Sequence, residues 1–418
     1  MRWRLQLTSS LAAASQRAPS LAAQAQHAFL PQGYPSSVSP SYLRYSAWAA
    51  SGAVLSSASG VLATSSLLVA LGVSASTALP FSAATTWVLK DGLGQLGGVL
   101  YAAALGTSFD ADPKRWRQVS ALALDGAGVM EVCILALAPL HVLPFLPFAA
   151  LANVARNVAW LSASATRAGL HSALARKGNL ADITAKAGSQ STAAATLGTA
   201  LGVGLSMAAP HAGAALALYL ALAAGHQACV FSSLRAVVLP TLSGARLHLA
   251  WQRAVAGDAW GAPMRALLRT PEEVCALEHF LPWQPPLAPP YLHVVQRLQE
   301  AAAIADAAAF VVEGGEEPHH ALVAGACGRV HIFLARSADP ERVLLAHLHA
   351  ERAAWELAQL EAPARVALEA RVAAVARARA WTQRLGAPLL AGLCDAGWRT
   401  SDPVLEGSLG QRFDFARA

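Results

Sequence analysis

Six segments of the chain are long and apolar enough to cross a lipid bilayer, and they restrict the fold more than any other feature. The hydrocarbon core of a bilayer is about 30 Å thick, so a spanning helix needs about 20 mostly apolar residues. The candidate segments are 47–73, 81–106, 120–140, 141–163, 192–209 and 211–232. Charged residues make up 13% of the chain, whereas soluble domains average about 25%. We therefore predict a mainly α-helical, polytopic membrane domain of about six spans.

The positions of Lys and Arg support an even number of spans, because basic residues collect on one side of a membrane. The basic connections all fall on one side of the six-span arrangement: Arg44, 114–117, 165–191 and 235–246. The opposite connections contain no Lys or Arg; they are 74–80, 138–144 and 208–213. The segment 141–163 carries an arginine and is rich in proline near its start, so it either spans or is re-entrant or interfacial. The basic segment 165–191 is expected to be a loop between spans, with short helices of its own.

Small residues are spaced for close helix packing in this region. Gly94 and Gly98, and likewise Gly198 and Gly202, have the small-x-x-x-small spacing that lets membrane helices approach closely. Residues 92–97 also match the dinucleotide pattern G-x-G-x-x-G, but they lie inside an apolar run without a βαβ unit. Helix packing is therefore the preferred interpretation of these glycines.

Charge and proline become more frequent after residue 235, which indicates a soluble C-terminal part. Thr270, Pro271, Glu272 and Glu273 are typical of a helix start, with an N-cap, a proline and two acids in the first turn. A proline-rich linker follows at 282–290. The elements predicted beyond it are strands at 309–312, 320–324 and 328–334 and helices at about 340–360 and 362–384. These elements predict a small α+β domain.

The predicted domain organisation has four parts. They are an N-terminal segment 1–28, a membrane domain 29–250, a helix and linker 251–290, and the α+β domain 291–418. Residues 1–28 contain arginines, Ser, Thr and Ala but no acid, which indicates either an organellar transit peptide or a disordered terminus. Residues 29–38 are expected to form an ordered loop that leads into the first span.

Four ionisable residues lie at membrane depth, where charge is costly and usually functional or paired. Lys90 and Asp91 are adjacent, so on a helix they point in different directions and each needs a partner elsewhere. Asp125 and Glu131 in the third segment are the expected partners of Lys90. The alternatives left open are a polar pathway, a structural ion pair, or a Lys90 side chain that reaches an interface.

Four polar residues of the basic segment would share one face of a helix and could bind an anionic or polar ligand. They are Asn179, Asp182, Lys186 and Gln190. A local interpretation competes with this one, because Asn179 and Asp182 resemble a capping box and Asp182 and Lys186 an i,i+4 pair. Arg167 and the end of the segment at 188–190 are not explained by capping, which favours a ligand or partner surface.

Other signatures argue against several classes of protein. His319, His320, His347 and His349 lack the spacing of metal ligands, so they are expected to be solvated, with no metal bound. The cysteines lie far apart and are expected to be free thiols. No cluster of basic and aromatic residues indicates nucleic-acid binding. No hydrolase, P-loop or zinc-protease motif occurs, so an enzyme and a bound cofactor are not expected.

Several separate motifs, in the same order, resemble the root UVB sensitive family. They are Phe29-Leu30-Pro31-Gln32-Gly33-Tyr34-Pro35, Trp87-Val88-Leu89-Lys90-Asp91-Gly92, Lys114-Arg115-Trp116-Arg117, Ala165-Thr166-Arg167-Ala168, Asn179-Leu180-Ala181-Asp182 and Ala185-Lys186-Ala187-Gly188-Ser189-Gln190. The resemblance covers residues 29 to about 250 well and the remainder more loosely. It departs from the family pattern at Ala121 and Leu124, where members carry an acid and an Asn.

The resemblance implies a role in UV-B sensing, early development and vitamin B6 homeostasis. It also implies a plastid (chloroplast) membrane location, with the mitochondrion as the alternative, and pairing with a second family member or copy. A B6 vitamer such as pyridoxal phosphate would then be a ligand of a transporter-like or scaffold protein. Two alternatives remain open: a membrane-anchored enzyme that uses Asp125 or Glu131 as a base, and a membrane-tethered interaction module built on the C-terminal domain.

Overall fold

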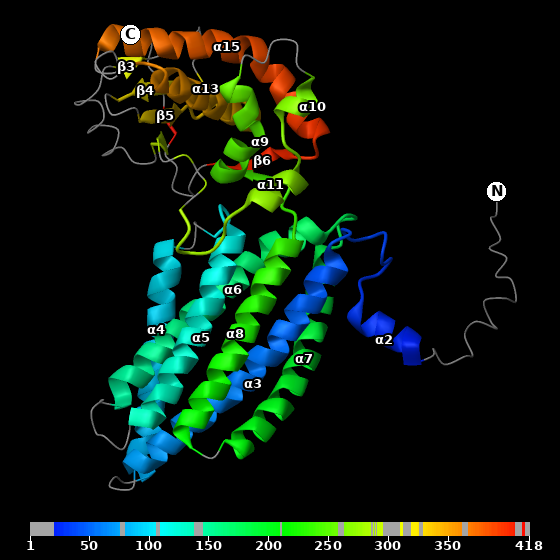
Figure 1. Cartoon of the computed structure of the whole chain (residues 1–418), viewed down its shortest axis with the longest axis vertical. Helices are drawn as coiled ribbons and strands as arrows, with labels where there is room; N and C mark the ends of the chain where they lie inside the picture. Colours follow the sequence, from blue (N-terminus) through cyan, green and yellow to red (C-terminus); the bar gives the residue numbers. More distant parts are fainter. Residues whose placement is uncertain are drawn as a thin grey trace, which may run out of the picture.

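The computed structural model describes two packed parts of the chain, a helical bundle and a smaller α+β domain at one end of it (Figure 1). The described residues are 21–75, 80–105, 109–137, 145–209, 211–257, 263–285, 287, 289, 291–295, 310–311, 319–325, 329–361, 367–405 and 412–413. The predicted mainly α fold with a C-terminal α+β part is confirmed. Most of the segment 1–28 lies outside the described residues; α2 (Leu21–Phe29) covers its end.

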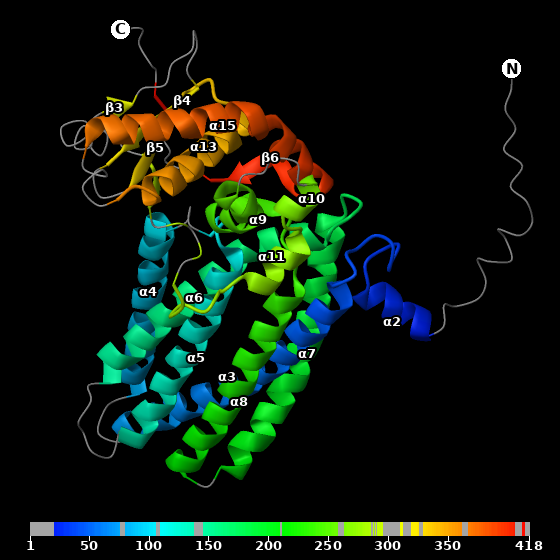
Figure 2. The same ribbon diagram turned by 45° about the horizontal axis from the view of Figure 1, so that its top comes forward.

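Six long helices form the bundle. They are α3 (Tyr42–Ala75), α4 (Pro80–Leu105), α5 (Pro113–Leu137), α6 (Phe145–Leu174), α7 (Leu180–Ala208) and α8 (Ala212–Ala236). Helix α3 packs against α5, α7 and α8, α5 packs against α6, and α4 lies at the edge against α6 (Figure 2). Helices α7 and α8 thus lie on one side of the bundle and α4 and α6 on the other, with α3 and α5 between them.

Within the described residues, four helices rather than six are long and apolar enough to cross a membrane. Their spanning parts are Tyr42–Ala70, Pro113–Leu135, Leu180–Ala208 and Ala212–Ala236. The predicted count of six spans is therefore corrected to four. Helices α4 and α6 run alongside these four, but α4 carries Lys90 and Asp91, and α6 carries Asn153, Arg156 and Asn157. These polar side chains lower the apolar character of both helices.

Glycines allow α7 and α4 to approach their neighbours closely, as their spacing predicts. A Cβ added at Gly198 of α7 would lie 2.2 Å from the Val54 carbonyl oxygen of α3, and one at Gly202 would lie 2.7 Å from the Ala58 carbonyl oxygen. A Cβ at Gly94 of α4 would lie 2.2 Å from the Asn153 side chain of α6. The close approach of α7 to the α3 backbone needs residues without side chains. The interpretation of these glycines as packing positions is confirmed.

The basic segment 165–191 is not the predicted loop. Helix α6 continues to Leu174 and α7 begins at Leu180, so only five residues connect them. Both helix ends bury apolar side chains, among them Leu170, Leu174 and Ile183, in a shared core. This burial stabilises helix where the density of charge alone predicted a loop.

The C-terminal domain combines helices with two small sheets. Its helices are α9 (Gly244–Ala256), α10 (Met264–Leu267), α11 (Pro271–Leu277), α13 (Pro340–Ala358) and α15 (Leu368–Asp395). Strands β2 (Leu292–Val294), β3 (Phe310–Val311), β4 (His320–Ala324) and β5 (Val330–Leu334) form a sheet in the order β2-β5-β4-β3. A separate parallel pair joins β1 (Thr241–Ser243) to β6 (Arg399–Val404).

The strands predicted at 309–312, 320–324 and 328–334 and the helix starts predicted at Thr270 and Pro340 are confirmed. Thr270 and Glu273 also form a capping box at α11. The helix start predicted at about 362 lies outside the described residues, and α15 begins at Leu368. Helix α15 is longer than predicted and continues through Pro388. Leu389, Leu390 and Leu393 are buried beyond that proline in a core shared with α9 and α13. Their burial outweighs the helix-breaking effect of the proline.

Candidate functional site

A cavity of about 420 Å³ lies between α3, α5, α6, α7 and α8, at the end of the bundle nearest the C-terminal domain. Apolar and aromatic groups, including the indole rings of Trp48 and Trp160, form part of its wall. The polar side chains of the lining are Tyr45, Ser46, Ser56, Ser57, Arg117, Ser120, Arg167, His171, Gln190, Ser191, Thr192, His226 and Ser233. A polar lining of this kind, with two arginines, is suited to a small charged ligand.

Two arginines face this cavity without a carboxylate in ion-pair contact with either of them. Arg117 lies in the second turn of α5 and Arg167 about two turns before the end of α6, so the paired helices bring both to the same end. The guanidinium groups act on each other electrostatically, and Arg117 donates to the Ser120 hydroxyl at 3.0 Å. Among the described residues neither arginine forms an ion pair. The cavity therefore carries excess positive charge that an anion would neutralise.

His171 contributes a neutral imidazole to the same wall. Its Nδ1 lies 3.0 Å from the Thr184 hydroxyl of α7, and its ring packs edge-on against Tyr45. Burial, and secondly the neighbouring Arg167 guanidinium, lower the pKa of His171 to about 4. The imidazole is therefore uncharged at neutral pH and can donate or accept one hydrogen bond toward a ligand.

His226 lines the cavity from α8 and connects it to the buried carboxylate of Asp125. Its Nδ1 lies 2.9 Å from Asp125 Oδ2. Gln227 donates to the same carboxylate, and Gln118 donates to the Gln227 amide oxygen. Tyr219 donates to the Asp125 backbone carbonyl at 3.0 Å. Asp125 is thus held in a hydrogen-bonded network one layer behind the cavity.

The other charges in the bundle do not pair as predicted. Lys90 contacts its neighbour Asp91 at 2.7 Å and lies over the Trp87 ring at 4.4 Å. Glu131 instead pairs with Arg156 of α6, so the prediction that Asp125 and Glu131 are direct partners of Lys90 is wrong. Long flexible side chains let adjacent residues on a helix meet, and the partner Arg156 comes from a different helix.

Asn153 ties the Lys90–Asp91 pair to α6. Its amide donates to the Lys90 backbone carbonyl at 3.1 Å and to Asp91 Oδ1 at 3.3 Å. The Lys90 ammonium also acts electrostatically on Glu131. The charged pairs therefore follow one another into the bundle, from Asp125 with His226 to Glu131 with Arg156 and then to Lys90 with Asp91.

The polar face at the start of α7 binds the chain's own N-terminal segment. Asp182 accepts a hydrogen bond from the Gln32 amide at 2.7 Å, and Lys186 donates to the His27 carbonyl. Gln190 donates to the Phe29 carbonyl at 2.7 Å. Residues 27–32 therefore cover the face that the sequence presented as a ligand surface, and only its last member, Gln190, also lines the cavity.

The capping box proposed for Asn179 and Asp182 does not form. Asn179 occupies the N-cap position of α7, but its side chain makes no capping hydrogen bond. Both of its amide atoms are buried and have no hydrogen-bond partner among the described residues. Asp182 is instead directed to the N-terminal segment, which competes successfully for its carboxylate.

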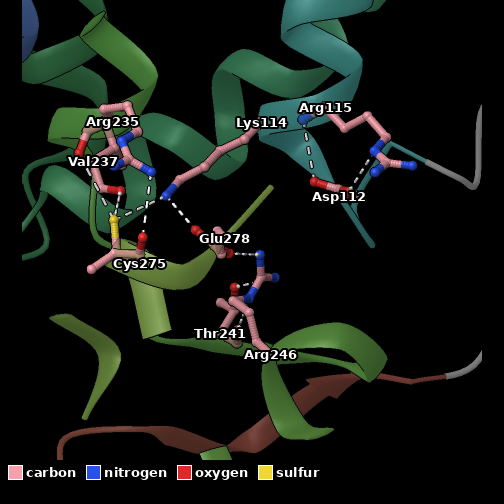
Figure 3. A network of polar contacts seen from close by, with 10 residues as sticks. Asp112, Lys114, Arg115, Arg235, Val237, Thr241, Arg246, Cys275 and Glu278 are labelled. Atoms are coloured by element: carbon pink, nitrogen blue, oxygen red, sulfur yellow. Dashed lines mark hydrogen bonds and ion pairs between the residues drawn. The ribbon is translucent and has the colours of Figure 1, made fainter. Parts of the chain in front are cut away.

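A polar network fixes the start of α5, and with it Arg117, to the C-terminal domain (Figure 3). Lys114 is 1% exposed and donates to the Glu278 carboxylate and to Cys275 Sγ, the latter at 3.2 Å. Arg246 of α9 lies 3.4 Å from the other oxygen of Glu278. The cavity end of the bundle is therefore rigidly connected to α9 and α11.

The histidines of the C-terminal domain are not the solvated groups that were predicted. His320 Nε2 lies 2.9 Å from His349 Nδ1, and burial is the main cause that lowers the pKa of His320 to about 3 and of His349 to about 4. In the part of the chain that the structure describes, no group of three or more His, Cys, Asp or Glu side chains is placed to hold a metal ion. Cys133, Cys229, Cys275 and Cys394 are free.

The cavity brings together Arg167 and Gln190 from the predicted site, with Asp125 directly behind it. Sequence reasoning missed Arg117, His171 and His226 as members. Arg117 belongs to a motif shared with the family, which is the signal that could have identified it. His226 lies in an apolar helix, and no sequence pattern connects it to Asp125.

These features define the class of protein: a helical bundle with membrane-length apolar helices and a basic, polar cavity between them. The family model described as "Vitamin B6 photo-protection and homoeostasis domain" matches residues 15–258. The chain belongs to this family, which confirms the resemblance to root UVB sensitive proteins. The description of the family model connects this domain with vitamin B6 photo-protection and homoeostasis.

Curated relatives agree with the family assignment. The chain is 36% identical over 175 residues to "RUS family member 1" of Dictyostelium discoideum, covering 42% of this chain and 33% of that protein. It is 39% identical over 179 residues to "Protein root UVB sensitive 2, chloroplastic" of Arabidopsis thaliana, covering 43% and 40%. The chain thus spans less than half the length of these relatives. No solved structure is significantly similar.

Proposed function

We propose that the cavity binds a small phosphate-bearing anion, a phosphorylated form of vitamin B6, and that the bundle carries it through a membrane. The observation that carries this proposal is the pair of arginines, Arg117 and Arg167, which face one cavity and have no carboxylate partner among the described residues. Guanidinium groups match phosphate oxygens in geometry and charge. The family's connection to vitamin B6 supplies the class of anion.

The rest of the lining suits the remainder of such a ligand. A volume of about 420 Å³ lies within the range of roughly 300–1,000 Å³ that is usual for small-molecule sites. Serine and threonine hydroxyls and the neutral His171 can hydrogen-bond ring substituents, while the indole rings of Trp48 and Trp160 offer apolar surfaces for a flat ring. The cavity is therefore furnished for a phosphorylated heteroaromatic compound.

Charged groups deeper in the bundle support transport rather than storage. Along α5, Asp125 and Glu131 follow Arg117 at successive depths, and each is paired with a residue of α8 or α6. Intramembrane ionisable groups that pair inside a bundle are typical of substrate and ion pathways. In this proposal the protein is a carrier, not an enzyme, because the Asp125 carboxylate is occupied by His226 and Gln227.

The proposal places the protein in an organellar membrane. A relative is named as chloroplastic, which supports the plastid, and the mitochondrion is the alternative. Pairing with a second family member or a second copy is also part of the proposal, because α4 has a neighbour on one side of the bundle and exposes large apolar side chains such as Val88, Leu96 and Val99. Lipid or a second family protein would cover that surface.

The test compares two ligands that differ only in the phosphate. Pyridoxine 5′-phosphate and pyridoxine both lack an aldehyde, so neither forms imines with lysines. Purified full-length protein in lipid nanodiscs should bind the phosphate ester and bind pyridoxine much more weakly. Arg117→Gln and Arg167→Gln should each weaken binding of the ester by roughly 10- to 150-fold, the value of a hydrogen bond to a charged group.

Arg176→Gln is the matched control, because Arg176 is an exposed arginine at the same end of the bundle that does not line the cavity. It should bind as the wild type does. Equal affinity for the two ligands, or equal loss in the Arg176 variant, would refute an anion site at the cavity. Uptake of the ester into proteoliposomes then tests transport. Binding without uptake would mean that the protein binds the ester but does not carry it across the membrane.

A further inference from the structure

The His226–Asp125 pair has the arrangement of a proton-binding site attached to the cavity. The imidazole lines the cavity and its Nδ1 lies 2.9 Å from Asp125 Oδ2. This hydrogen bond places the Nδ1 proton toward the carboxylate, so Nε2 on the opposite edge of the ring is the atom left for a further proton. Within the described part of the chain, Nε2 has no hydrogen-bond partner. Residues His226 and Asp125 are 4% and 6% exposed.

Charged and polar groups from several helices surround this pair. From α5, Arg117 acts electrostatically on Asp125, and from α6 Arg156 is paired with Glu131. From α8, Tyr219 and Gln227 bind Asp125 as neutral donors. A positive imidazolium in the empty cavity would face the two unneutralised arginines, which repel it.

The helices α3 and α7 add no charge next to His226. On α3, Gly52 lies against the ring, where an added Cβ would be 3.6 Å from His226 Cδ2, and the α3 side chains of the cavity are neutral. On α7 the cavity residues are Gln190 and small or hydroxyl-bearing neighbours. The charge balance at His226 is therefore set by the arginines, Asp125 and whatever anion the cavity holds.

We infer that the His226–Asp125 pair takes up a proton when an anion binds to Arg117 and Arg167, so that binding is coupled to protonation. This inference rests on the proposed function, because it requires an anion in the cavity. The proton comes from solvent through the cavity, bonds to His226 Nε2 and returns to solvent when the anion leaves. Asp125 stabilises the imidazolium.

The coupling is reciprocal by thermodynamic linkage: if an anion strengthens proton binding, a proton strengthens anion binding by the same factor. A coupling of typical size corresponds to roughly 5- to 150-fold in affinity. A carrier with this property would move an anion together with a proton, and a pH gradient across the membrane would drive uptake.

The test is calorimetric titration of wild-type protein in nanodiscs with pyridoxine 5′-phosphate at pH 7.5. Titrations in two buffers of different ionisation enthalpy give the number of protons exchanged per ligand. The expected result is net uptake of up to one proton. The ligand's own phosphate contributes with the opposite sign, because its monoanion loses a proton when arginines favour the dianion.

Two variants locate the proton. His226→Gln removes the accepting nitrogen, and Asp125→Asn removes the charge that stabilises the imidazolium; both should bind the ester more weakly, by the coupling factor of roughly 5- to 150-fold, and take up no proton. His279→Gln, at an exposed histidine outside the bundle, should behave as the wild type. If neither variant folds, the wild-type measurement alone decides.

The outcomes separate this inference from the proposed function. Binding of the ester without proton uptake by the wild type would overturn the inference and leave the anion site intact. Unchanged uptake in the two pair variants would also overturn it, since the proton would then bind elsewhere. Failure of the wild type to bind the ester would overturn both.

Discussion

Replacing Gly198 with alanine should destabilise the bundle, although alanine is the better helix former. A Cβ at this position would lie 2.2 Å from the Val54 carbonyl oxygen and 2.8 Å from the Ser57 side chain. Ordinary contact distances begin near 3.4 Å, so α7 would have to move away from α3 by about 1 Å. A gap of 0.5–1 Å forfeits roughly a quarter to a half of each dispersion contact along the interface.

The magnitude follows from two opposing effects. Alanine in place of glycine gains about 1 kcal/mol of helix propensity, whereas forcing an extra methyl group into a packed interface costs about 1–3 kcal/mol and occasionally more. The obstructing atom at Gly198 belongs to the backbone, which cannot rotate away, so the upper end of that cost applies. We expect a net loss of about 2 kcal/mol in the free energy of unfolding.

Gly204 on the same helix provides the matched control. No atom lies within 4 Å of a Cβ added there, so Gly204→Ala should raise stability by about 0.5–1 kcal/mol through propensity alone. Thermal unfolding of the three proteins in the same detergent, followed by the fluorescence of the 11 tryptophans, measures the difference. Equal stabilisation by both substitutions would refute the close approach of α7 to α3.

Three further predictions concern buried polar groups. The pKa of His171 is lowered in the folded protein to about 4, so the unfolded chain binds this proton at a higher pH than the folded protein does. Acidification from pH 7 to pH 4 should therefore destabilise the wild type by up to roughly 3 kcal/mol relative to His171→Gln. Lys114→Met should cost about 3 kcal/mol in unfolding free energy, because it leaves the largely buried Glu278 carboxylate, 11% exposed, with one partner fewer. Asp182→Ala should cost about 1 kcal/mol and speed hydrogen exchange at the Gln32 amide.

Each of these has a result that contradicts it. Parallel stability profiles for wild type and the His171 variant between pH 7 and pH 4 would mean that this histidine is not buried in the neutral form. If Lys177→Met, at an exposed lysine, lowered stability as much as Lys114→Met, the contact with Glu278 would carry no special weight. Unchanged exchange at Gln32 would show that Asp182 does not hold the N-terminal segment.

Local signals in the sequence identified most of the secondary structure. Membrane-length apolar runs and a helix-start motif at Thr270 depend on neighbouring residues, and these features appeared where they were predicted. The count of spans failed because polar residues such as Lys90 in α4 and Arg156 in α6 make these two helices less apolar than a spanning helix.

The candidate site was accessible to sequence reasoning only in part. Arg167 and Gln190 were named because they lie in a polar segment, and both line the cavity. His226 was missed because a single histidine in an apolar helix is usually a core residue. Its role depends on Asp125, 101 positions earlier in the chain, and on the crossing of α5 and α8.

The sequence by itself determined the mainly helical fold, the family and the presence of excess positive charge at one end of the bundle. These follow from composition, periodicity and motifs, which are properties of short segments. Only the tertiary structure decided which charges remain unneutralised. Asp182 and Lys186 bind residues 27–32, Glu131 takes Arg156, and Arg117 and Arg167 are left facing a cavity, because pairing depends on distances between helices rather than positions along the chain.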